Sequence, residues 1–149
     1  MTLYWEDFVV GETSPIGTHT FTEAEIIDFA RQFDPQPFHM DPEAARASAF
    51  GGLIASGWHT CAICMRLNCE SYINRSVSLG SPGLDNIRWH QPVRPGDTIH
   101  YRRTVLETRA SQSRPDMGLV RSRTEALNQA GELVMSMEGW GMFGRRPGA

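Results

Sequence analysis

The sequence predicts one α+β domain in which a long buried helix is followed by four antiparallel strands. The length of 149 residues is typical of a single domain, and 40% hydrophobic with 21% charged residues is enough for a packed core. From Trp58 to about Asn74, apolar residues occupy more than one side of a helical pattern, which is typical of a buried helix. Beyond it the hydrophobic pattern alternates, as in strands. We expect one domain over 1–149, with flexible ends at 1–4 and 144–149.

Before the long helix, the sequence predicts a short N-terminal strand and then two helices. The segment "TFTEAEIIDFARQF" is predicted to form the first helix, because Thr22 as N-cap and Glu25 three positions later make a capping box. The bend at Pro35 ends this helix. Asp41 as N-cap and Pro42 at the first helical position open the second helix, which runs through "EAARAS".

Between these helices lies "FDPQPFHMDP", which holds two carboxylates, one histidine and three prolines in ten residues. Proline restricts its own φ and moves the residue before it out of the helical region. We therefore expect Phe33 to His39 to be a rigid loop, neither helix nor central strand. Such a loop would hold Asp34 and His39 in a defined geometry, as catalytic groups require.

Four strands are predicted after the turn-rich segment "SLGSPG". They are "LDNIRWHQPV", "TIHYRRTVLETRAS", "MGLVRSRTEALN" and "ELVMSMEGWGMF". "RPGD" is a turn between the first two, and "NQAGE" joins the last two as a hairpin. From Arg145 onward we expect a frayed tail. A long helix wrapped by one curved antiparallel sheet is the hot-dog architecture, and the other face of the sheet, or its edge, is expected to pair with a second subunit.

The composition restricts the partners and the location. The net charge is −3, which argues against nucleic acid as the main partner, because such domains usually carry a basic stripe. All basic residues are arginine; genomic bias and recognition of phosphate or carboxylate both remain open, and without lysine no side-chain Schiff base can form. We find no signal peptide and no membrane-spanning segment, so we expect no membrane partner and a cytoplasmic location.

The cysteines do not indicate a metal or a disulfide framework. There are three of them, an odd number. Cys61 and Cys64 form a C-x-x-C, but no second pair of ligands accompanies them. Residues three positions apart in a helix share a face, so we expect core-packed thiols and no metal site.

The stretch "FARQFDPQPFHMDPEAARASAFGGLIASG" resembles the MaoC-like dehydratases, the (R)-specific enoyl-CoA hydratases. "QPVRPGDTI" resembles the strand–turn–strand segment of the same family, and the resemblance covers about Trp5 to Phe143. The matching residues are Asp34, Pro37, His39, Ala45, Phe50, Ile54, Ala55 and Gly57. The departures are Phe33 for glycine, Gln36 for asparagine, an aromatic Phe38, Ser56 for histidine, and Met65 where some members carry serine. They suggest a subfamily with its own acyl pocket.

The resemblance implies a hydratase or dehydratase that adds water to a 2-enoyl-CoA thioester or removes it from the 3-hydroxyacyl-CoA. It implies that Asp34 and His39 form a catalytic dyad that holds one water and moves its protons. It also implies that the backbone N–H of Gly57 is an oxyanion hole at the start of the long helix. Gln36 and Ser56 are candidate substrate-binding residues. No cofactor is expected, because coenzyme A is part of the substrate, and a homodimer or higher homo-oligomer is expected.

Other interpretations stay open. Asp34 could be a turn residue bonded to its own backbone, and Ser56 could only cap the helix. Asp41 is interpreted as a plain N-cap and His59 as a satisfied polar group. The alternative functions are a hot-dog acyl-CoA thioesterase and a non-catalytic acyl-thioester-binding subunit. Acyl length, acyl carrier and physiological direction are left open. Six arginines are candidate partners for the phosphates of CoA: Arg88, Arg94, Arg102, Arg103, Arg121 and Arg123.

Overall fold

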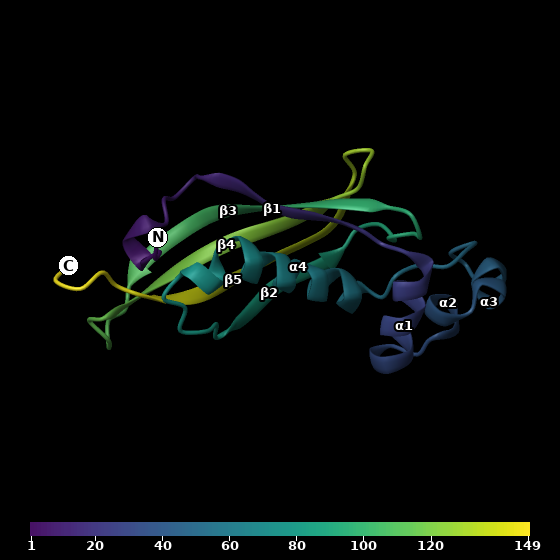
Figure 1. Cartoon of the computed structure of the whole chain (residues 1–149), viewed down its shortest axis with the longest axis horizontal. Coiled ribbons are helices and arrows are strands. Elements are labelled where there is room, and N and C mark those ends of the chain that lie inside the picture. The colour runs from purple at the N-terminus through teal and green to yellow at the C-terminus, as the bar shows by residue number, and fades with distance from the viewer.

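A curved antiparallel sheet of five strands wraps one side of helix α4 in the computed structural model, which describes residues 1–149 (Figure 1). The strands are β1 (Thr13–Thr20), β2 (Gly83–Trp89), β3 (Thr98–Ala110), β4 (Met117–Leu127) and β5 (Leu133–Gly144). Their order across the sheet is β1-β3-β4-β5-β2, and all neighbours are antiparallel. This arrangement confirms the predicted α+β hot-dog fold.

Alternation of apolar residues explains why β3 forms one long strand against the helix. Ile99, Tyr101 and Val105 are all at most 2% exposed, as expected for alternate positions on the face that covers a core. The hydroxyl of Tyr101 donates to the carbonyl of Thr60 in α4 at 3.0 Å, which ties the strand to the helix. The expected hairpin over 128–132 joins β4 to β5.

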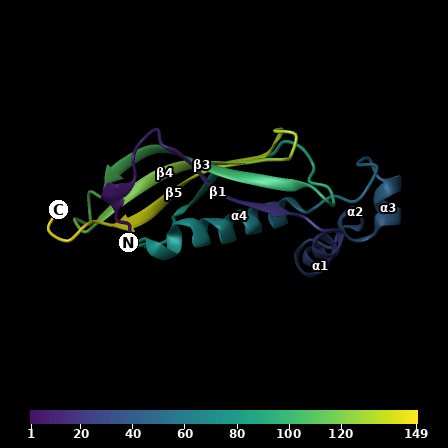
Figure 2. The same ribbon diagram turned by 45° about the horizontal axis from the view of Figure 1, so that its top comes forward.

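Helix α4 (Gly57–Ser71) lies along the sheet and is followed by a 3-10 turn, Ile73–Arg75 (Figure 2). Its buried apolar residues are Ile63, Cys64 and Leu67. The expectation that this helix is buried on most sides is wrong for the single chain, because Trp58 is 56% exposed and Met65 is 53% exposed. The sheet covers only one side of the helix, and the apolar residues on the other side have no cover within this chain.

Three shorter helices lie beyond one end of the sheet (Figures 1 and 2). They are α1 (Glu23–Phe33), α2 (Pro37–Met40) and α3 (Pro42–Ala47). The capping box of α1 is present as expected: the N–H of Glu25 donates to Oγ1 of Thr22 at 3.2 Å. Asp41 caps α3 as expected, since its Oδ1 accepts from the N–H of Glu43 at 3.0 Å.

The expected loop over 33–39 is only partly correct. Residues 34–36 are a loop, but His39 lies in the short helix α2. The reason is that Pro37 occupies the first helical position, where its fixed φ suits a helix and its missing N–H removes no hydrogen bond. Proline therefore starts a helix here instead of preventing one.

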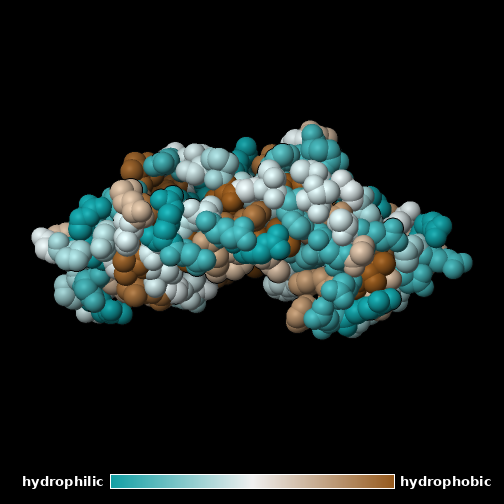
Figure 3. Space-filling model, viewed as in Figure 1, coloured by the Kyte–Doolittle hydropathy of each residue, from teal (hydrophilic) through white to brown (hydrophobic).

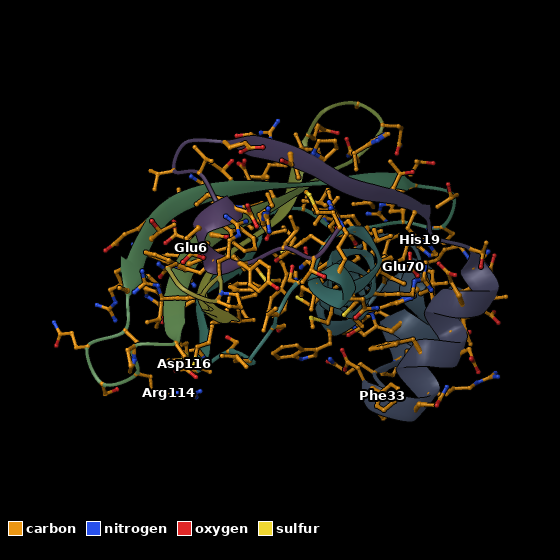
Figure 4. All side chains as sticks on the ribbon, turned by 60° about the vertical axis from the view of Figure 1, so that its left-hand side comes forward. Glu6, His19, Phe33, Glu70, Arg114 and Asp116 are labelled. Carbon is orange, nitrogen blue, oxygen red and sulfur yellow. The ribbon has the colours of Figure 1, made fainter.

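The two ends of the chain lie at the end of the molecule opposite α1–α3 (Figure 1), and Figure 4 shows Glu6 on the side away from Phe33. Arg145 Nε lies 3.3 Å from a carboxylate oxygen of Glu6, and Arg146 Nη2 lies 2.7 Å from one of Asp7. The N–H of Leu3 donates to a carbonyl in the 3-10 turn that follows α4, at 2.8 Å. The first two residues of the expected tail thus make ion pairs, and the flexibility of the two ends stays a prediction.

None of the helices has both the length and the hydrophobicity needed to cross a membrane. On the face shown in Figure 3, hydrophobic areas are small and lie among hydrophilic ones. Two of the exposed large apolar side chains, Trp58 and Trp89, border the pocket described next.

Candidate active site

A pocket of about 490 Å³ lies at the N-terminal end of α4, where the end of α1, helix α2 and the end of β2 meet it. Four of the five predicted site residues line this pocket: Asp34, Gln36, His39 and Gly57. The larger apolar lining residues are Phe38, Phe50, Ile54, Trp58, Trp89, Val93 and Val134. A cavity with apolar walls and a few converging polar groups is typical of a small-molecule site.

The acid and the imidazole face each other inside this pocket. Asp34 is the C-cap of α1 and His39 belongs to α2, and their Oδ2 and Nε2 atoms are 3.2 Å apart. Their side chains are 18% and 6% exposed, respectively. His39 Nδ1 lies 2.7 Å from the carbonyl oxygen of Ile54, which can only accept, so Nδ1 carries the proton. Nε2 is therefore the ring nitrogen that is available for chemistry.

The carboxylate of Asp34 is held by two neutral donors. The amide of Gln36 donates to Oδ1 at 2.7 Å, and the hydroxyl of Ser56 donates to Oδ2 at 2.7 Å. Burial alone would raise the pKa of Asp34, but these two hydrogen bonds and the charge of His39 outweigh it and lower the pKa below its usual value. The aspartate is therefore held in its ionised form.

Ser56 does not line the pocket, because it is fully buried behind Asp34. Its hydroxyl oxygen accepts from the N–H of Trp58 at 3.2 Å and so caps α4. Its single proton is used on Asp34. Ser56 thus has both the capping role and a hydrogen bond to the acid, and Gln36, not Ser56, lines the pocket.

Gly57 is the first residue of α4 and lines the pocket, and its N–H has no partner within the helix. Together with the helix dipole, this N–H favours negative charge at the same place. The indole of Trp89 packs directly on Gly57, in the space that a Cβ would occupy. Trp89 Nε1 also donates to the carbonyl of Gly57 at 3.0 Å. Only glycine fits this position without movement of the indole.

Three pocket residues were not anticipated from the sequence. Trp58 and Trp89 pack edge to face, with ring centroids 5.2 Å apart. His90 lines the pocket next to Trp89, and its Nε2 lies 2.8 Å from Oγ of Ser136. The available signal was position, since both Trp89 and His90 directly precede the segment "QPVRPGDTI" that resembles the family.

The remaining candidates lie outside the pocket. His59 is buried between the rings of Phe21 and Phe29. Its interpretation as a satisfied polar group is wrong for one ring nitrogen, Nδ1, which has no hydrogen-bond partner. Burial raises the pKa of Cys61, and it raises the pKa of Cys64 to about 12, as expected for packed thiols. Three of the six candidate arginines are paired with carboxylates: Arg102, Arg121 and Arg123.

Comparison with known proteins gives consistent results. A crystal structure of a MaoC-like dehydratase from Rhodospirillum rubrum is 45% identical, with a TM-score of 0.89, covering 97% of this chain and 99% of that chain. The Bacillus subtilis protein YdeM is 28% identical over 125 residues, which are 83% of this chain and 86% of the relative. The 3-hydroxyacyl-thioester dehydratase Z of Mycobacterium tuberculosis is 38% identical over 82 residues, which are 54% of each chain.

A sheet wrapped around one helix, with an acid–imidazole pair at the start of that helix, defines a hot-dog domain with a polar site in its pocket. The family model described as MaoC like domain matches residues 11–127. The chain belongs to the MaoC-like domain family.

Proposed function

We propose that this protein is a hydratase or dehydratase that acts on a 2-enoyl or 3-hydroxyacyl thioester, with coenzyme A as the carrier. The observation that carries the proposal is the pair of Asp34 and His39, 3.2 Å apart, in one pocket with the first N–H of α4. Membership of the MaoC-like family and relatives named dehydratase support a hydro-lyase activity.

In the proposed reaction, Oδ2 of Asp34 and Nε2 of His39 hold one water molecule. As the water oxygen bonds to C3 of the enoyl group, one of its protons passes to this pair, and the pair supplies one proton to C2. The whole water is thereby added across the double bond, and dehydration is the reverse. The hydrogen bond from Nδ1 to Ile54 keeps Nε2 as the atom that exchanges the proton.

After the water oxygen bonds to C3 and before C2 gains a proton, the thioester oxygen carries negative charge. The N–H of Gly57 is the group proposed to stabilise this charge, because it is the first amide of α4 and lines the pocket. Gln36 borders the same pocket and holds Asp34 through its amide. No cofactor is needed in this scheme, since the thiol carrier arrives with the substrate.

The test is the loss of the conjugated enoyl-thioester absorbance with crotonyl-CoA and with longer or branched enoyl-CoAs. Asp34→Asn and His39→Ala should each reduce the rate by about 10²- to 10⁴-fold, which is the usual contribution of a positioned acid or base. Asp41→Asn is the matched control: this nearby carboxylate caps α3 outside the pocket, asparagine also caps well, and the rate should not change.

Circular dichroism of each variant shows that the fold is kept. Full activity in folded Asp34→Asn or His39→Ala would refute the assigned roles. Release of free thiol from saturated acyl-CoAs, without loss of enoyl absorbance, would show a thioesterase instead.

A further inference from the structure

His59 is an ionisable ring buried between α4 and the helix that carries Asp34. It lies in the first turn of α4, is only 4% exposed and does not line the pocket. Its ring stacks on that of Phe29 in α1, with centroids 4.6 Å apart and planes 7° apart. The ring of Phe21, just before α1, meets it edge to face, with centroids 4.8 Å apart. An imidazole thus occupies a place where packing alone would be served by an apolar ring.

This aromatic surrounding suits the neutral imidazole and not the charged one. Nδ1 of His59 is buried without a hydrogen-bond partner, and the histidines that pair with carboxylates are His19 and His39. A protonated imidazole carries N–H on both nitrogens, so Nδ1 would become a buried charged donor without an acceptor. The cation–π contact with Phe29 is the smaller effect. Burial accordingly lowers the pKa of His59.

The charged groups that face His59 are already paired with one another. They are Glu25 of α1, His19 of β1 and Arg66 of α4. The carboxylate of Glu25 lies 2.6 Å from Nε2 of His19 and accepts from the N–H of Thr22 at 3.3 Å. Arg66 can only donate, and its Nη2 lies 3.2 Å from Nδ1 of His19, so Nε2 carries the proton given to the carboxylate. Figure 4 shows His19 near the point where β1 leads into the helices. No counter-ion is left for His59.

The contact between His59 and Phe29 also bears on the acid of the pocket. Phe29 packs on Phe33, with ring centroids 5.0 Å apart, and Phe33 directly precedes Asp34 at the end of α1. The position of α1 against α4 therefore determines where the carboxylate lies relative to the first N–H of α4. A displacement of about 1 Å between reacting groups can cost on the order of 100-fold in rate.

We propose that His59 is a positioning residue for Asp34, and that it holds α1 against α4 only while its ring is neutral. Protonation would separate the two helices and withdraw the acid from the pocket. Once exposed to water, an imidazole has a pKa of about 6.5, so the open form gains population as the pH falls below this value. The opening of α1 is independent of the proposed hydratase activity, whereas the effect on rate rests on it.

The experiment is amide hydrogen exchange of the whole chain at pH 7.5 and pH 5.5, with each rate divided by its intrinsic rate at the same pH. Protection in α1 should fall about tenfold at pH 5.5, because an exposed imidazole is then about ten times more often charged than neutral. Protection in β3 and β4 should not fall. His59→Phe keeps an aromatic ring without a proton and should abolish the fall. His19→Gln, which keeps a donor toward Glu25, should retain it.

The rate of crotonyl-CoA hydration tests the link to Asp34. Between pH 7.5 and pH 5.5 the wild type should lose a larger share of its kcat/KM than His59→Phe, because only the wild type adds the opening of α1 to the titration of the dyad. An equal loss in both would overturn the positioning role. A wild type without any hydration activity would refute the proposed function alone, because the exchange experiment needs no substrate.

Unchanged protection of α1 at pH 5.5, or an equal fall in β3 and β4, would overturn the proposal. An NMR titration of the wild-type imidazoles decides the question even if His59→Phe fails to fold. The signal of His59 should stay at its neutral position while that of His100, an exposed residue of β3, changes with pH. A His59 signal that follows that of His100 would also overturn the proposal, because the closed form would then accept the charge.

Discussion

The hydroxyl group of Ser56 affects both the start of α4 and the ionisation of Asp34. Its oxygen accepts from the N–H of Trp58 at the start of α4, and its proton goes to Asp34. A hydroxyl has one proton, so it can donate to only one of its neighbours. The start of the helix and the ionisation of the acid therefore depend on the same side chain.

Ser56→Ala should lower the free energy of unfolding by about 0.5–2 kcal/mol, the usual cost of losing an N-cap. It should also raise the pKa of Asp34 relative to the wild type, because one of the hydrogen bonds that lower this pKa is lost. As the pH falls, Asp34 would then become protonated at a higher pH than in the wild type. The acid limb of the pH–rate profile for enoyl-CoA hydration should therefore shift to higher pH.

Thr22→Ala is the matched control for this change. Thr22 caps α1 in the same way, but it neither lines the pocket nor contacts Asp34. It should lose similar stability and leave the pH–rate profile unchanged. An equal upward shift in Thr22→Ala would show that helix stability, not the hydrogen bond, sets the acid limb.

Gly57→Ala should strongly reduce activity, because the new Cβ would collide with the indole of Trp89 at the proposed oxyanion site. Overpacking of this kind typically costs about 1–3 kcal/mol of stability. Denaturant unfolding with tryptophan fluorescence measures the cost. Adding Trp89→Ala should restore part of the stability in the double variant. A double variant that is destabilised by the sum of the two single changes would argue against the collision.

The residues that meet in the pocket were predictable to different degrees. Asp34, His39 and Gly57 stand in short motifs, and local chain geometry largely determines where they lie. Trp89 comes from a distant strand and reaches Gly57 through tertiary packing, which no local pattern encodes.

At the scale of elements, β1 and α4 fit together at Gly17. The register of β1 with β3 shifts between Pro15 and Gly17, which marks a bulge. Gly17 has φ +146°, and a Cβ there would lie 2.9 Å from a methyl group of Leu67 in α4. Glycine thus serves both the backbone conformation and the close approach of the helix.

Gly17→Ala should destabilise the protein more than Gly83→Ala. Gly83 has a similar φ of +153° but open space around its Cβ, so it controls for backbone strain alone. The difference between the two variants in denaturant unfolding should be about 1–3 kcal/mol, the usual cost of overpacking. Equal losses would mean that Leu67 moves aside easily.

The limits of the element predictions have a physical cause. The alternation of apolar and polar residues predicts the strands and the hairpin between the last two of them. The hairpin over 128–132 lies where it is expected. The sequence pattern of α4 predicts apolar residues on several sides of the helix. It does not indicate that the sheet covers only one of these sides. Trp58 and Met65 therefore remain exposed in the single chain.

At the scale of the whole molecule, we expect two copies to associate. Strand β2 is an open edge of the sheet, and the uncovered side of α4 exposes Trp58 and Met65 next to it. Sedimentation velocity at micromolar concentration should give about twice the mass of the 16.7 kDa chain. Met65→Glu should shift the protein toward monomer, because it would place charge in the proposed interface.

Val10→Glu is the control for this experiment. Val10 is 55% exposed, similar to Met65, but lies in the turn before β1. It should leave the mass unchanged. A stable monomer of the wild-type chain at this concentration would refute the expectation.

The proposed dyad residues lie at the C-terminal end of α1 and in α2, whereas the proposed oxyanion donor belongs to α4. Polar contacts between the dyad segment and the residues that lead into α4 include His39 to Ile54, Ser56 to Asp34, and the N–H of Ile54 to the carbonyl of Phe38 at 3.3 Å. A ligand that touches both parts would add to this short set. Amide hydrogen exchange in α1–α3 should therefore slow when a thioester analogue binds, while exchange in β3 and β4 stays the same.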